Sequence, residues 1–233
     1  AMRLWLLGDG LGPTMDLSQM FDTSSTAVAR LDQAHALAPD DDLALGFDGL
    51  ANALVGHRLG NSNMVSAGLA ELDQGIARLP AYTHFLRALA AADEQDYGTA
   101  VSHMFQTLAA CGVPPDAGPT FTYAAGPQDA QHAACNDEGV VPHVFEGFCI
   151  TFGDFLLRSG AGAEAARAAY RSAQTSPTYA QWPFAPELEA RIAQADERAA
   201  AYADGGAGDA GDGGPALWPS SGHVCTGCHQ QHP

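Results

Sequence analysis

Residues 68–80 read Gly-Leu-Ala-Glu-Leu-Asp-Gln-Gly-Ile-Ala-Arg-Leu-Pro, and this stretch decides the fold that we expect. Small residues stand at Gly68 and Gly75, the large Leu72 stands between them, and Pro80 ends the stretch. On a helix the first three positions share one face, where the small residues let a second helix approach and the leucine fills the gap. Because proline ends a helix, the stretch predicts the second half of a helical pair.

The same spacing of small, large and small residues recurs along the chain. Ala27, Leu31, Ala34 and Pro39 repeat it residue for residue. Two partial copies contain Asp96, Tyr97, Ala100 and Met104, and Ala166, Tyr170, Ala173 and Pro177. We therefore expect several helical pairs that pack in the same way.

This pattern resembles the tetratricopeptide (TPR) repeat, a helix–turn–helix unit of about 34 residues. Val55, Gly56 and Leu59 match the first-helix pattern of that family ahead of Gly68. The resemblance covers residues 24–110 and 140–203. It implies a TPR-like α-solenoid whose concave face binds peptides or partner proteins.

Apolar periodicity supports the same all-α class. Over residues 140–160 apolar side chains recur at three- and four-residue steps, which indicates one buried helix face. Strand signals are nearly absent. Further helices are predicted at about 24–38, 41–59, 63–79, 81–92, 95–110, 162–175 and 186–203.

The composition predicts three parts of the chain. A helical domain over residues 1–203 is interrupted by a Pro-, Gly- and Asp-rich loop at 111–139. Residues 204–222 are rich in Gly and Asp, as in a flexible linker. Residues 223–233 form a tail with its own chemistry.

The tail contains Cys225-Thr-Gly-Cys228-His229, the attachment signature of haem c. Each thiol adds to one haem vinyl group, and the adjacent imidazole then lies under the iron as proximal ligand. With 5 Cys and 9 His in 233 residues, chance would produce about 0.004 such motifs. We therefore expect one covalent haem c on Cys225 and Cys228, with His229 as an axial ligand of the iron.

A structural zinc site is the main alternative. His223, Cys225, Cys228, His229 and His232 supply enough nitrogen and sulfur ligands for tetrahedral zinc. A redox-active Cys-x-x-Cys pair is less favoured, since no βαβ pattern surrounds it.

The second axial ligand of the iron is expected from the helical body or from another subunit, because the residues after His229 include no Met. His57, at a first-helix position that lines the concave face in TPR proteins, is the first candidate. His84 and His143 follow, and His35 and His103 rank lower.

The remaining cysteines indicate an oxidising compartment. Cys111 and Cys135 bound the long loop and fit a disulfide, although a pairing with Cys149 stays open. Cys149 lies on an apolar helix stripe and is expected to be a buried free thiol. Haem c attachment and disulfides both occur outside the cytoplasm, so we expect a periplasmic or extracellular protein whose signal peptide has been removed.

The charge excludes some functions. A net charge of -17, with arginine as the only basic residue type, repels nucleic acid. No apolar stretch approaches the roughly 18 residues of a membrane span. The run Asp40-Asp41-Asp42 and the Asp/Gly linker offer oxygen ligands for Ca²⁺, but solvated charge is the favoured interpretation.

Three functions follow for testing. The favoured one is electron transfer by an extracytoplasmic haem protein, with haem-mediated self-assembly into head-to-tail filaments or docking on a redox partner. The second is a TPR-type interaction scaffold whose tail holds a structural metal such as zinc. The third is a haem sensor or a peroxidase-like enzyme with an open iron position, which is less favoured because no distal acid–base pair is evident.

Overall fold

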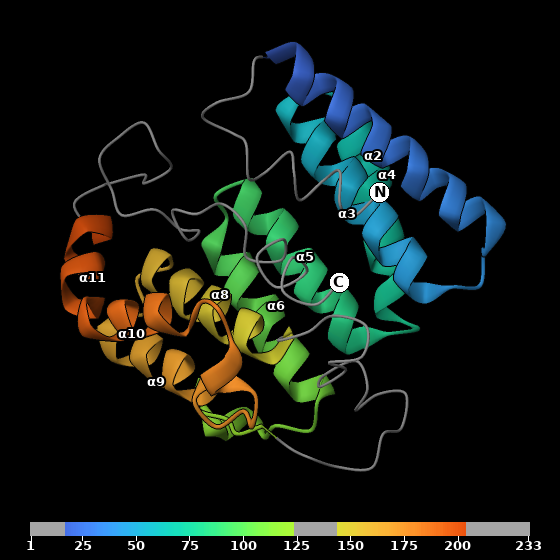
Figure 1. Cartoon of the computed structure of the whole chain (residues 1–233). Helices are drawn as coiled ribbons and strands as arrows, with labels where there is room; N and C mark the ends of the chain where they lie inside the picture. Colours follow the sequence, from blue (N-terminus) through green and yellow to red (C-terminus); the bar gives the residue numbers. More distant parts are fainter. Residues whose placement is uncertain (1–16, 124–143, 204–233) are drawn as a thin grey trace. The chain divides into compact units, whose positions relative to one another are not determined.

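The computed structural model of the chain describes residues 17–123 and 144–203. Within these two stretches every regular element is a helix, which confirms the expected all-α class for the described part (Figure 1). None of these helices has the length and apolarity that crossing a membrane would require. The chain divides into two compact units, whose boundary falls between Thr107 and Leu108 inside one helix.

The first unit contains four helices and most of a fifth: α2 (Leu17–Leu37), α3 (Asp42–Arg58), α4 (Ser62–Ile76), α5 (Pro80–Asp93) and α6 (Tyr97–Ala110). Local signals set several helix starts. Asp41 caps α3 by accepting hydrogen bonds from the backbone N–H groups of Leu43 and Ala44. Asn61 caps α4 in the same manner. Pro80 stands in the first turn of α5, where its missing N–H is not needed.

Glycines bring the backbones of α3 and α4 very close together. A Cβ atom on Gly68 would lie 2.6 Å from the backbone nitrogen of Ala53, and one on Gly49 would lie 2.8 Å from the carbonyl oxygen of Gly68. No side chain fits at either position. Leu72 beside them is fully buried. The packing expected from the spacing of small and large residues is thus confirmed at this pair of helices.

Helix α5 packs against both members of this pair. A Cβ atom on Gly75 of α4 would lie 2.9 Å from Thr83, and one on Gly46 of α3 would lie 3.0 Å from Leu86. The shared core consists of Leu50, Ala53, Leu54, Leu72, Leu86 and Ala90. Helix α2 lies alongside α3 and contributes Val28 and Leu31 to a second small core (Figure 1).

The other copies of the small–large–small spacing differ in how they pack. Ala34 of α2 is exposed, so that copy does not place its second small residue at a helix interface. The anchor residues of the two partial copies are fully buried, namely Ala100 and Met104 in α6 and Ala166, Tyr170 and Ala173 in α9. Burial of the named anchors therefore holds in α6 and α9, whereas in α2 Leu31 is buried and Ala34 is exposed.

The second unit contains η1 (Pro115–Ala117), α8 (Val144–Arg158), α9 (Ala163–Ala173), η2 (Tyr179–Gln181), α10 (Ala185–Ala193) and α11 (Ala195–Ala203). The single helix expected over residues 186–203 is wrong. The chain leaves helical geometry at Gln194, where φ is -94° and ψ is 8°. The break turns this segment into two short helices that pack separately on α9 and on each other.

The start of the predicted long loop is tied to the helices of the second unit. The backbone N–H of Phe121 donates to Oγ of Ser172 at 3.1 Å, and that of Tyr123 donates to Oγ1 of Thr175 at 2.8 Å. The Phe121 ring is buried and makes edge contacts with Phe145 of α8. Phe121 therefore contributes to the core of the second unit, while residues 124–139 lie outside the described residues.

Gly153 sets the approach of α8 to α9, and replacing it tests this packing. A Cβ atom there would overlap the ring of Tyr170, which is buried and cannot move away. We expect Gly153→Ala to destabilise the protein by about 1–3 kcal/mol, as overpacking does elsewhere. Denaturant unfolding followed by circular dichroism measures the loss.

The matched control is Gly147→Ala in the same helix, where an added Cβ would meet nothing within 4 Å. That change should stabilise the helix by about 0.5–1 kcal/mol. Equal effects of the two substitutions would contradict the proposed packing.

Candidate functional site

The structure describes only some of the residues singled out by the sequence. Cys225, Cys228, His229, His143 and Cys135 lie outside the described residues. His57, His84, His35 and His103 lie in the first unit, and Cys111 and Cys149 lie in the second. The candidate site is therefore built from the histidines of the first unit.

His57 forms an ion-pair contact with Asp93. Its Nδ1 lies 2.7 Å from Oδ2 of Asp93, and the two residues come from the last turn of α3 and the last residue of α5. The His57 side chain is 48% exposed and that of Asp93 is 22% exposed. Packing of α3 on α5 brings together these two residues, which are 36 positions apart in the sequence.

The contact determines which nitrogen of His57 carries hydrogen. An ionised carboxylate only accepts hydrogen bonds, so Nδ1 must be the donor. In the neutral ring the lone pair then lies on Nε2. His57 thus presents an exposed imidazole whose free nitrogen is suited to bind a metal or accept a proton.

His84 and His103 form a different arrangement. Their Nδ1 atoms lie 3.0 Å apart and their ring centroids 5.2 Å apart, across α5 and α6. Burial lowers the pKa of His84 and that of His103, and the proximity of His103 lowers the pKa of His84 further. Both rings are therefore neutral near pH 7, and one Nδ1 donates to the other.

A group of carboxyls, which the sequence analysis did not single out, lies between α2, α3 and α4. Asp48 is buried, and its Oδ1 accepts a hydrogen bond from Asn52 at 3.3 Å. Burial, followed by the nearby carboxyls of Asp32 and Glu71, raises the pKa of Asp48 to about 7. Burial also raises the pKa of Glu71. The Asp48 carboxyl therefore stays protonated over much of the acidic pH range.

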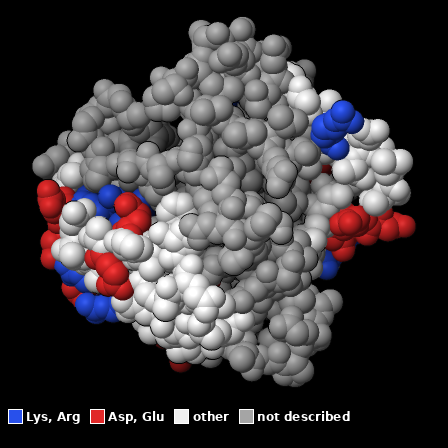
Figure 2. Space-filling view, in the orientation of Figure 1, with Lys and Arg blue, Asp and Glu red and all other residues white. Residues whose placement is uncertain are grey.

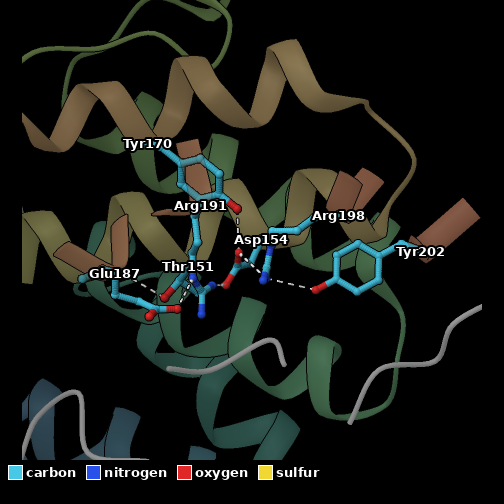
Figure 3. A network of polar contacts seen from close by, with 8 residues as sticks. Thr151, Asp154, Tyr170, Glu187, Arg191, Arg198 and Tyr202 are labelled. Atoms are coloured by element: carbon cyan, nitrogen blue, oxygen red, sulfur yellow. Dashed lines mark hydrogen bonds and ion pairs between the residues drawn. The ribbon is translucent and has the colours of Figure 1, made fainter. Parts of the chain in front are cut away.

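The second unit holds a buried ionic network around Asp154 (Figure 3). Arg191 pairs with Oδ2 of Asp154, and the hydroxyl of Tyr170 donates to Oδ1 at 2.6 Å. Nη2 of Arg198 lies 3.4 Å from the same oxygen and donates to the Tyr202 hydroxyl at 3.1 Å. The charged members are at most 7% exposed.

This network ties buried side chains together. Both oxygens of Asp154 have partners, and Asp154 is 2% exposed. Burial lowers the pKa of Arg191 to about 9, so the guanidinium still carries its charge at neutral pH. Arg191 also pairs with Glu187 at 3.2 Å. The network joins α8, α9, α10 and α11 through one carboxylate.

Two of the cysteines, Cys111 and Cys149, lie in the described part of the chain. Cys111 is disulfide-bonded, and its partner lies outside the described residues. Cys149 is a buried free thiol, as expected, and burial raises its pKa well above the ordinary value. The pairing of Cys111 with Cys135 stays a prediction.

Surface charge in the second unit is mixed in sign. Over α9, α10 and α11 the arginine and acidic side chains are interspersed (Figure 2). Arg167, for example, pairs with both Glu164 and Asp196.

Two residues of the acidic run Asp40–Asp42, at the start of α3, have structural partners. Asp41 caps the helix, and Oδ1 of Asp42 lies 3.1 Å from Nη1 of Arg78. Among the described residues, no group of three or more His, Cys, Asp or Glu side chains is arranged to hold a metal ion. Solvated charge stays the favoured interpretation of Asp40–Asp42, and calcium binding there stays the untested alternative.

No protein-family model matches the chain, and no curated protein or solved structure is similar to it. Its function has to be inferred from its own residues.

Removing the central carboxylate of the buried network should be costly. Asp154→Ala leaves Arg191 and Arg198 buried without their shared anion, and we expect a loss of about 3–5 kcal/mol in unfolding free energy. Asp196→Ala removes an exposed partner of Arg167 and should change stability little. A comparably small effect at Asp154, measured by denaturant unfolding, would show that the network does not hold this unit together.

The carboxyl of Asp48 should make stability depend on pH. Its pKa is about 7 in the folded chain against an ordinary value of 3.8. Between these values the folded state keeps a proton that the unfolded chain has released, so this contribution to stability falls as pH rises from about 4 to about 7. Asp48→Asn should flatten the dependence and be more stable than wild type at pH 8.

Thermal unfolding across this pH range measures the effect, with exposed Asp40→Asn as the control. Parallel curves for wild type and Asp48→Asn would contradict the assigned protonation.

Proposed function

We propose that the protein is an extracytoplasmic c-type haem protein that transfers electrons. The observation that carries this proposal is the motif Cys225-Thr-Gly-Cys228-His229. Both thiols of such a motif bind haem vinyl carbons, and the histidine binds the iron. The haem supplies the one-electron chemistry, and the helical body supplies its second ligand and its partner surface.

The location of the protein is part of the same proposal. Covalent haem attachment requires reduced thiols at the motif but takes place in the compartments where structural disulfides persist. The disulfide at Cys111 fits a periplasmic or extracellular protein.

We also propose that the haem tail docks on a redox partner or on a neighbouring copy of the chain. A tail that binds the helical body of the next copy makes a head-to-tail contact, which closes into rings or continues as a filament. A TPR-like solenoid, implied by the resemblance at residues 24–110 and 140–203, would offer the receiving surface.

A pyridine haemochrome spectrum tests the haem directly. Protein produced with an extracytoplasmic haem-maturation system should show a c-type α band that stays with the denatured chain. The double variant Cys225→Ala, Cys228→Ala should lose all covalent haem while keeping the helical circular dichroism of the body.

Absence of covalent haem from the matured wild type would overturn the proposal. About one equivalent of zinc, lost in the same double variant, would then establish the metal-tailed scaffold. A covalent but high-spin haem that binds carbon monoxide rapidly would instead favour the sensor or peroxidase-like function.

A further inference from the structure

We propose that His57 is the second axial ligand of the haem iron and that Asp93 positions its ring. The assignment rests on the proposed function, since only a haem-bearing chain has an iron for His57 to bind. Both residues belong to the first unit, and both are described.

The nitrogen donors of His57 fit this role. Nδ1 donates to Asp93 at 2.7 Å, which leaves the lone pair of the neutral ring on Nε2. Histidines that bind metals commonly donate their other N–H to a carboxylate, which fixes the ring and raises its basicity. In the first unit Asp93 provides this orientation before any metal is bound.

Access to His57 fits as well. The side chain is 48% exposed at the end of α3, so a haem iron can reach Nε2 without displacing a helix. Nη2 of Arg58 lies 4.0 Å from the other oxygen of Asp93 and helps to hold this carboxylate in place.

His84 is less suited to the role. Its Nδ1 faces the Nδ1 of His103 at 3.0 Å rather than a carboxylate, and the ring is partly buried against its neighbours. Coordination through Nε2 of His84 requires its Nδ1 to be the donor in this pair, and two neutral imidazoles do not fix which ring donates. The structure thus favours His57 over His84 as the axial ligand, although the sequence alone ranked the two histidines close together.

The spin state of the ferric haem tests the assignment on the full matured chain. Wild type should be low-spin, and His57→Ala should become high-spin and bind added imidazole far faster, and its reduced form should bind carbon monoxide far faster, with unchanged covalent haem and circular dichroism. The matched control His84→Ala should stay low-spin.

Asp93→Asn tests the positioning role. An anionic acceptor increases electron donation from the ring to ferric iron, so its loss should raise the midpoint potential while the low-spin spectrum is kept. A merely structural His57–Asp93 contact would leave the potential of the haem unchanged.

Mixing two variants identifies whose haem His57 binds. The His57→Ala chain supplies a haem without this ligand, and the haem-free Cys225→Ala, Cys228→Ala chain supplies His57 without a haem. Restoration of the low-spin spectrum on mixing, increasing with concentration, shows ligation between copies. A wild type that is low-spin at every dilution, with no restoration in the mixture, shows ligation within one chain.

Two results would overturn these proposals, and they are distinct. Absence of covalent haem from the wild type overturns both the haem function and the ligand assignment. Covalent haem that stays low-spin in His57→Ala overturns the assignment alone.

Discussion

The close approach of helix backbones at glycine is the constraint on which the first unit depends. Gly49 and Gly68 remove the side chains that would hold α3 and α4 apart, and Gly46 does the same between α3 and Leu86 of α5. Hydrophobic burial then stabilises the three helices together. Because α3 and α5 are held in this register, their carboxyl-terminal residues His57 and Asp93 come within hydrogen-bond distance. The placement of His57 beside Asp93 thus depends on helix packing at glycines some distance away from it.

Much of the helical fold could be predicted because helix formation leaves a local, periodic signal. The segments expected at 41–59, 63–79 and 81–92 correspond to α3, α4 and α5 within a few residues. Two predictions failed for physical reasons. The break at Gln194 has no Gly or Pro to announce it, so the apolar period alone suggested a continuous helix. The exposure of Ala34 depends on which helices cover α2, and the spacing of residues along one helix does not carry that information.

The candidate sites, like the fold, could be predicted from the sequence only in part. The proposed haem-attachment motif could be read from the sequence because its chemistry needs neighbouring residues at a set spacing. The partners of the histidines were not visible, since Asp93 is 36 residues from His57 and meets it only through packing. Asp154 carried a weak signal that was missed, namely an acidic residue inside a strongly apolar helix face. Such a carboxylate must find a cation when it is buried, and Arg191 and Arg198 are that cation pair.

The place of Arg198 also has a mechanical consequence. It lies within α11, where its guanidinium contacts Asp154 and donates a hydrogen bond to Tyr202, the residue before Ala203 at which the helix ends. Any force applied to the chain beyond this helix enters the folded body at that point. Through Arg198 the force acts on the Asp154 carboxylate, which four helices share. Helix α11 therefore resists unfolding one turn at a time. Pulled through the segment that follows α11, the second unit would bear load through all four of these helices together.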